Sequence, residues 1–264
     1  MINKVLLPVL VPILLSISVN SQQQHSFHPG KVWPDNNGVH INAHGEGILF
    51  YNNTYCWYGE HKVEGKKGNR AQVGVHVYSS ADLYNWKDEG IALSVDEKDK
   101  TSDITKGCIL ERPKVIYNKK TKKFVMWFLL KLFNMGYDAA RSGVVVSDHP
   151  TGPFTFVKLF RPNAGYWPVN VQAFHKQPVA ESIKDTYCGG LGCLPGHVDS
   201  VNILGRDFKN GQMARDMNLF VDDDGSAYHL YLSEKKAHCI FHNLLMTIYP
   251  IKYLIDYIFF IVSS

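Results

Sequence analysis

Three carboxylate side chains occupy comparable positions beside strand-like apolar runs. Glu60 ends one run, and Glu111 and Asp216 each lie just ahead of another. Carboxylates accept hydrogen bonds from hydroxyl groups and act as general acids or bases. The alternative for Glu60 and Asp216 is a solvated loop charge, because exposed charges are the norm. The alternative for Glu111 is a surface ion pair with Arg112 or Lys114.

The elements that must position these carboxylates form a repeat. Two apolar runs joined by turn residues recur three times, at residues 48–51 with 54–58, 114–117 with 123–128, and 218–221 with 226–231. Each pair predicts a β-hairpin. Residues 222–225 read Asp-Asp-Asp-Gly, which we interpret as a turn because the remaining ligands of a calcium loop are missing.

A second hairpin follows each of the first two, at residues 74–80 with 86–91 and 143–147 with 154–157. Two hairpins make a four-stranded sheet, and radial repetition of such sheets is the plan of a β-propeller. The repeat predicts two blades and the first half of a third, with each carboxylate beside the innermost strand of its own blade. Residues 161–212 interrupt the repeat, and we interpret them as a surface insertion pinned by a Cys188–Cys193 disulfide.

The chain begins with a short basic start and an apolar run, which predicts a secretory signal peptide over residues 1–21. A membrane anchor is the alternative, but Pro8 and Pro12 interrupt a run shorter than the roughly 20 apolar residues of a span. Export predicts a secreted protein whose cysteines can form disulfides. Cys56 and Cys108 lie in or beside strand-like runs, where small buried hydrophobes are expected.

Composition excludes some classes of partner. The net charge of +4 over 264 residues is too mild for nucleic-acid binding, and no basic stripe is interleaved with aromatic residues. Small or neutral partners are expected. The chain has no CxxC pair and no HExxH motif, so we predict no metal site and no cofactor. Asn52-Asn53-Thr54 is a glycosylation sequon, which predicts an exposed turn.

The pattern changes abruptly after Glu234. Residues 235–264 are strongly apolar, without turn signals or alternation. A transmembrane tail is one interpretation, but Pro250, Lys252 and Asp256 break the apolar run. The other interpretation, which the broken pattern favours, is an aberrant tail that arises from read-through or an incorrect gene model. We therefore expect no membrane partner.

Several motifs together resemble glycoside hydrolase family 43. They are Trp57-Tyr58-Gly59-Glu60, Ser80-Ala81-Asp82-Leu83-Tyr84-Asn85-Trp86, Glu111-Arg112-Pro113-Lys114-Val115-Ile116-Tyr117-Asn118, Ser147-Asp148-His149-Pro150-Thr151-Gly152-Pro153-Phe154 and Asp222-Asp223-Asp224-Gly225-Ser226-Ala227-Tyr228. Within the family, Ala43-His44-Gly45-Glu46-Gly47-Ile48-Leu49 and Arg215-Asp216-Met217 resemble the exo-β-1,3-galactanase branch. The resemblance covers about residues 32–234, and the motifs occur in order on the predicted hairpins.

The resemblance implies an all-β fold of the five-bladed β-propeller family. Residues 22–234 would supply about two and a half blades, as a partial glycoside hydrolase domain. Family 43 enzymes invert the anomeric carbon, which requires a protonated carboxyl group and a base that activates water. Glu111 matches the carboxylate that raises the pKa of the general acid by like-charge repulsion.

Other site residues follow from the same resemblance. Glu60 and Asp216 match positions that bind sugar hydroxyls, and Tyr137 matches an aromatic residue that contacts substrate, with ordinary packing as its alternative. The base of the wider family falls near His44 or Gly45, where this chain has no carboxylate, and we place His44 among the substrate-binding residues. The galactanase branch uses an amide from a later blade instead.

The general acid of the family lies in a Glu-x-Pro motif, expected about one hairpin after Glu234. Residues 235–264 contain no Glu, and Asp256 is their one carboxylate. We therefore expect a full-length relative to hydrolyse terminal β-1,3-linked galactosyl residues, and this chain to be inactive, to fold poorly and, if folded, to be a monomer. The alternatives are a secreted non-catalytic protein that binds a galactan-type glycan, and a propeller scaffold that binds protein.

Overall fold

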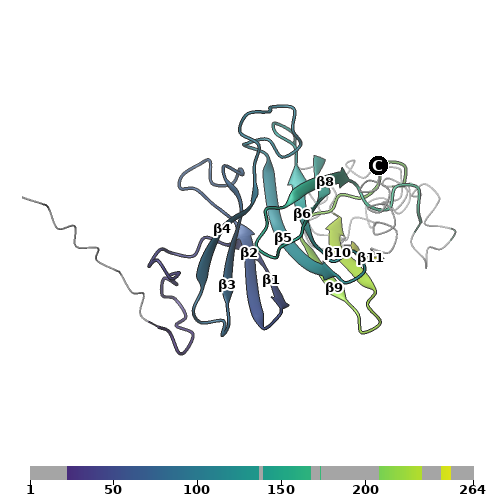
Figure 1. The fold of residues 1–264 in the computed structure, drawn as a ribbon. Coiled ribbons are helices and arrows are strands. Elements are labelled where there is room, and N and C mark those ends of the chain that lie inside the picture. Colours follow the sequence, from purple (N-terminus) through teal and green to yellow (C-terminus); the bar gives the residue numbers. More distant parts are fainter. Residues whose placement is uncertain (1–22, 137–138, 168–172, 174–207, 234–244, 251–264) are drawn as a thin grey trace, which may run out of the picture.

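The computed structural model describes residues 23–136, 139–167, 173, 208–233 and 245–250. Three antiparallel sheets stand side by side in it (Figure 1). The first sheet contains β1 (His44–Tyr51), β2 (Thr54–Glu60), β3 (Gly74–Ser80) and β4 (Lys87–Ser94). The second contains β5 (Ile109–Asn118), β6 (Lys123–Lys131), β7 (Arg141–Ser147) and β8 (Thr155–Phe160). The third contains β9 (Met217–Val221), β10 (Ala227–Ser233) and β11 (Leu245–Pro250).

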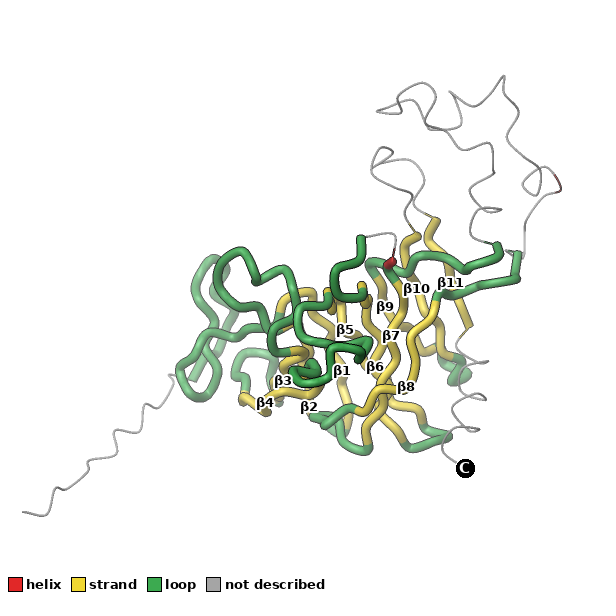
Figure 2. Tube along the Cα trace, turned by 90° about the horizontal axis from the view of Figure 1, so that it is seen from above, coloured by secondary structure: helices red, strands yellow, loops and turns green. Residues whose placement is uncertain are grey.

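The first strands of the three sheets lie next to one another. β5 contacts both β1 and β9, and Figure 2 shows β5 between them. Strands pair in chain order within the first two sheets. The all-β class and the predicted hairpins are confirmed, whereas five blades and closure of a propeller stay predictions.

Two turns show why the hairpins form where the sequence predicts them. Asn52 and Asn53 join β1 to β2 with φ angles of 48° and 57°, and asparagine tolerates this left-handed backbone better than most residues. Between β9 and β10, the Asp222 N–H donates to the Ser226 carbonyl at 2.8 Å and the Gly225 N–H to the Asp222 carbonyl at 2.9 Å. The interpretation of this acidic segment as a turn is confirmed.

Apolar side chains fill the spaces between neighbouring sheets. One core cluster joins the first two sheets through residues such as Tyr58, Val77 and Phe128. A second cluster joins the second and third sheets around Trp127 and Met217. Cys56 and Cys108 are free and buried, which confirms their prediction as small buried hydrophobes. Burial of these side chains from water is the main stabilisation of the sheet packing.

The third sheet has one strand more than the sequence predicted. β11, inside the predicted tail of residues 235–264, pairs antiparallel with β10 in a register that joins Tyr228 to Pro250 and Ser233 to Leu245. The estimate of two and a half blades therefore undercounts this sheet. Leu-Met-Thr-Ile-Tyr is rich in β-branched and large apolar residues, which favour a strand once a partner edge is present, but it lacks the alternation on which the sequence analysis relied.

Some predictions fall outside the described residues. They concern the signal peptide, the Cys188–Cys193 disulfide and most of the insertion at residues 161–212. Within the part of the chain that is described, no helix is long and apolar enough to cross a membrane.

Candidate active site

The site begins where the ends of β1 and β2 meet. His44 and Glu60 are register partners, and a β-bulge follows His44 in β1. The Glu60 side chain is 4% exposed, whereas that of His44 is 64% exposed. Gly45 has a φ of 65°, and a Cβ added there would lie 2.5 Å from Glu60 Oε1. A glycine at this bulge therefore leaves room for the buried carboxylate.

The two oxygens of Glu60 have different partners. Oε1 accepts a hydrogen bond from the Arg112 backbone N–H at 3.0 Å. Oε2 lies 2.5 Å from Lys62 Nζ and 3.4 Å from His44 Nδ1, but it has no hydrogen bond of regular geometry to any described residue. A buried carboxylate needs such compensation because its desolvation is costly. Oε2 is itself buried, and the Lys62 ammonium group beside it offsets its charge.

Arg112 links the three sheets at this point. It lies in a β-bulge of β5 between Glu111 and Lys114, with a φ of 60° that is unusual for a residue with a side chain. Its backbone N–H binds Glu60, and its Nε donates to Asp216 Oδ1 at 2.9 Å. The bulge thus directs the amide and the guanidinium of one residue to carboxylates of the two neighbouring sheets.

Glu111 is half-buried beside this contact. Burial raises the pKa of its carboxyl group, and the nearby Glu60 charge raises it further, while Lys62, Arg112 and Arg215 act in the opposite direction. Like charges held close together in a partly desolvated site resist simultaneous ionisation. The Glu60 charge and burial thus both disfavour ionisation of Glu111, and a perturbed carboxyl group of this kind is typical of functional sites.

Lys114 connects β5 to the bulge of β1 beside the site. Its Nζ donates to the Gly45 carbonyl at 3.1 Å and the Glu46 carbonyl at 2.6 Å, so it fixes the bulge of β1 against β5. Burial lowers the pKa of this ammonium group. A cavity of about 250 Å³ lies beside Lys114, lined by residues of β1, β5 and β9.

These groups suit a ligand with several hydroxyl groups. Asp216 is 55% exposed and Arg112 is 43% exposed on their side chains, so a ligand can reach both. Exposed ion pairs of this kind contribute little to stability, which leaves Asp216 available to accept hydroxyl hydrogen bonds. Among the described residues, no group of three or more His, Cys, Asp or Glu is arranged to hold a metal ion, and we assign no metal ligand.

Several solved structures that resemble the chain are of enzymes whose names state an action on galactosyl compounds. A family 43 β-1,3-galactosidase, solved with galactodeoxynojirimycin, is 48% identical with a TM-score of 0.68, over 77% of this chain and 58% of its own. The exo-β-1,3-galactanase from Clostridium thermocellum is 32% identical with a TM-score of 0.53, over 77% of this chain and 34% of its own. The chain is a family 43 galactanase-like protein.

An exo-β-1,3-galactanase from Phanerochaete chrysosporium, solved with galactose, is 28% identical to the galactanase-like chain, with a TM-score of 0.54. The match covers 84% of the galactanase-like chain and 42% of the Phanerochaete chrysosporium enzyme. The galactanase-like chain therefore spans about a third to three-fifths of the length of these three structures. No protein-family model and no curated protein matches it.

The structure brings together four of the five site residues predicted for the galactanase-like chain. Arg112 contacts Glu60 and Asp216, His44 lies 3.4 Å from Glu60, and Glu111 directly precedes Arg112 in β5. Tyr137 lies outside the described residues. The sugar-binding and pKa-tuning roles of the five stay predictions.

Sequence reasoning missed two residues of the site. Arg112 was considered as an ion-pair partner of Glu111, whereas the structure joins its side chain to Asp216, 104 residues further along the chain. No local signal predicts that contact. Lys62 could have been found, because residues two apart in an extended chain lie on the same side, and Lys62 follows Glu60 at that spacing.

Proposed function

We propose that this chain carries the galactosyl-binding part of an inverting glycoside hydrolase, and that a full-length relative releases terminal β-1,3-linked galactosyl residues. The observation that supports it is the meeting of Glu60 and Asp216 at Arg112, with Glu111 beside them. The names of the solved structures support the sugar, since one exo-β-1,3-galactanase was solved with galactose and, as a variant, with β-1,3-galactotriose.

The contacts assign a role to each residue in this proposal. Glu60 and the exposed Asp216 accept hydrogen bonds from adjacent hydroxyl groups of the galactosyl ring. Arg112 holds both carboxylates in place and can itself donate to the sugar. Glu111 raises the pKa of the general acid by repulsion when that acid is ionised, so the acid stays protonated near neutral pH.

In this proposal the chain can bind a galactosyl compound without hydrolysing it. Inversion needs a general acid and an activated water on opposite faces of the sugar, and the family takes its acid from a Glu-x-Pro motif. Loss of a general acid typically costs a factor of about 100 to 10,000 in rate. We propose that the chain by itself binds galactosyl compounds in the extracellular space without measurable hydrolysis.

A secreted, non-catalytic glycan-binding protein is the second candidate function. The same contacts favour it, because binding requires hydroxyl acceptors such as Glu60 and Asp216 but no general acid. The two candidates differ in whether any natural form of the protein turns over substrate.

The binding experiment uses calorimetric titration of the chain with galactose and with β-1,3-galactobiose, with xylose and arabinose as comparison sugars. Glu60→Gln removes the charge that Lys62 and the Arg112 amide stabilise, and it should weaken galactose binding roughly tenfold or more, the usual effect of losing a charged hydrogen bond. Glu97→Gln is the control, because Glu97 is 65% exposed and its partner is Lys106. Equal binding by both variants and the parent chain would contradict the proposal.

The turnover experiment measures galactose release from β-1,3-galactan. We expect none from this chain, and release from a full-length family 43 relative. Comparable release from both would show that the acid lies within this chain. Absence of release from both, with galactose binding retained, would favour the non-catalytic candidate.

A further inference from the structure

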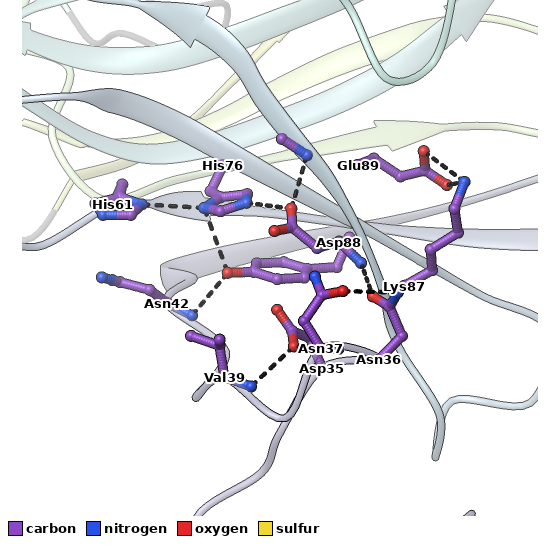
Figure 3. Close-up of polar contacts among 12 residues, drawn as sticks. Asp35, Asn36, Asn37, Val39, Asn42, His61, His76, Lys87, Asp88 and Glu89 are labelled. Carbon is purple, nitrogen blue, oxygen red and sulfur yellow. Dashed lines mark hydrogen bonds and ion pairs between the residues drawn. The ribbon is translucent and has the colours of Figure 1, made fainter. Parts of the chain in front are cut away.

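A network of polar side chains extends across the first sheet, from β4 to the segment before β1. The proposed function does not use this network. Half-buried Asp88 on β4 contacts His76 on β3 (Figure 3), and His76 in turn lies beside Tyr78 on the same strand. Asn42, just before β1, connects to Tyr78, and His61 stacks on His76 with ring centroids 5.2 Å apart. His76 and Tyr78 are only 8% and 2% exposed, so their polar atoms depend on one another.

The Asp88 carboxylate fixes the tautomer of His76 when His76 is neutral. His76 Nε2 donates to Asp88 Oδ1 at 2.6 Å, which leaves Nδ1 as the acceptor. The Tyr78 hydroxyl lies 3.3 Å from this Nδ1 and accepts from the Asn42 backbone N–H at 3.0 Å. His61 Nδ1 lies 3.0 Å from the same His76 atom, so two possible donors face its one lone pair. Asp88 thereby orients His76, and His76 lies beside the hydroxyl that holds Asn42.

The side chain of Asn42 forms hydrogen bonds with both the backbone carbonyl and the backbone N–H of Lys62. Its Nδ2 donates to the Lys62 carbonyl at 2.7 Å, and its Oδ1 accepts from the Lys62 N–H at 2.9 Å. The Lys62 ammonium then reaches Glu60 Oε2 at 2.5 Å. A continuous path of contacts therefore runs from Asp88 to the carboxylate of the candidate site.

The packing of Asn42 against β2 depends on a glycine. A Cβ added to Gly59 would collide with the backbone of Ala43, so the absence of a side chain lets residues 41–43 lie directly on β2. Gly59 is the register partner of His76, which places the polar network at the same level of the sheet.

We propose that Asn42, held by Tyr78, His76 and Asp88, is a positioning residue for galactosyl binding: it places the Lys62 ammonium on Glu60 and so fixes the carboxylate that accepts the sugar hydroxyl. This inference rests on the proposed function. A purely structural role would stabilise the first sheet without acting through Lys62, and the experiments separate the two.

The first experiment reads the position of Glu60 without sugar. The Arg112 N–H donates to Glu60 Oε1, so its amide resonance and its hydrogen exchange report where that carboxylate lies. Tyr78→Phe removes one hydroxyl and Asn42→Ala removes the clamp, and both should shift the Arg112 amide resonance and speed its exchange. Tyr55→Phe, on β2, is the control and should do neither. An unchanged Arg112 amide in both variants overturns the proposal, whatever the chain binds.

The second experiment measures the dissociation constant for galactose. Tyr78→Phe and Asn42→Ala should each raise it roughly threefold to tenfold, the range expected for loss of a neutral hydrogen bond. Asn42→Gln, which keeps the amide on a longer side chain, should restore part of the loss. Because Asn42 acts through Lys62, Asn42→Ala added to Lys62→Met should raise the constant no further than Lys62→Met alone.

The outcomes are distinguishable. Unaltered galactose binding in both single variants, or additive losses in the double variant, would leave only a structural role and overturn the inference. A parent chain that binds no galactose contradicts the proposed function, and the Arg112 amide then decides whether the positioning contact exists. If Asn42→Ala does not fold by circular dichroism, Tyr78→Phe carries both measurements, because it removes a single atom from a side chain that otherwise stays packed.

Discussion

His229 is completely buried between the second and third sheets. Its ring lies 4.5 Å from that of Trp127 on β6 and 4.9 Å from that of Tyr231. Neither ring nitrogen has a hydrogen-bond partner among the described residues. Burial lowers the pKa of His229 from 6.5 to about 3, because the imidazolium would lose its hydration without gaining a partner.

This burial predicts acid sensitivity. The unfolded chain takes up a proton on His229 near its usual pKa and the folded chain does not, so the contribution to stability is complete above pH 6.5 and is lost as the pH falls toward about 3. The full effect is on the order of a few kcal/mol. Urea unfolding at several pH values should show a shallower acid limb for His229→Phe than for the parent chain.

Exposed His149 supplies the control for that measurement. His149→Phe should leave the acid limb of the parent chain unchanged, because an exposed imidazole is hydrated in both states. Identical pH profiles for His229→Phe and the parent chain would show that His229 is solvated or paired in solution.

At the scale of the element, the connection between β3 and β4 is a loop fixed by side chains. Asp82 Oδ1 accepts from the backbone N–H groups of Tyr84 and Asn85, each at 2.8 Å. Ser80 Oγ accepts from the Leu83 N–H at 2.9 Å, and Leu83 has a φ of 67°. Burial acts against ionisation of Asp82, but these hydrogen bonds outweigh it and lower its pKa to about 2.

We expect Asp82→Ala to lower the free energy of unfolding by about 1–2 kcal/mol, because several backbone donors lose their acceptor. The Asp82 contribution is present above the usual aspartate pKa of 3.8 and is lost as the pH falls toward about 2. Denaturant titration measures the change. Asp148→Ala, just after β7, should change stability by less than about 0.5 kcal/mol, since Asp148 is 70% exposed and forms a surface pair with Lys123. Equal losses in the two variants would contradict the importance of the loop.

At the scale of the whole molecule, the first two sheets approach each other closely at a glycine. A Cβ added to Gly47 on β1 would lie 2.5 Å from the Pro113 carbonyl oxygen and 3.2 Å from Lys114 Cα on β5. Backbone atoms cannot rotate away as the end of a side chain can. Because Lys114 binds the Gly45 and Glu46 carbonyls beside this contact, separation of the sheets also disturbs the candidate site.

Gly47→Ala should therefore lower the free energy of unfolding by about 1–3 kcal/mol, the usual cost of overpacking, and it should weaken galactose binding. Thermal unfolding and calorimetric titration measure the two effects. Gly136→Ala is the control, because a Cβ there meets nothing within 4 Å. A neutral Gly47→Ala would mean that the two sheets pack less closely than the structure shows.

The sequence by itself determined the local part of the fold. Alternation of apolar residues with turn residues such as Asn52-Asn53 and Asp224-Gly225 located the hairpins, because strand period and turn geometry depend on residues close in the chain. It also selected Glu60, Glu111 and Asp216 as candidates, since the motifs around them resemble those of family 43 galactanases. β11 escaped prediction because its run does not alternate and its pairing depends on the free edge of β10.

Only the tertiary structure decided how these candidates meet. The bulge that sends the Arg112 amide to Glu60 and its guanidinium to Asp216 joins residues 52 and 104 positions apart, and the path from Asp88 to Lys62 runs through β4, β3, the segment before β1 and the segment after β2. Such contacts depend on how sheets pack and where a bulge turns a side chain. Residue spacing specifies neither the packing of the sheets nor the direction of a side chain at a bulge. The period of a strand predicts on which face of the sheet a residue lies, but not which residue of another sheet it contacts.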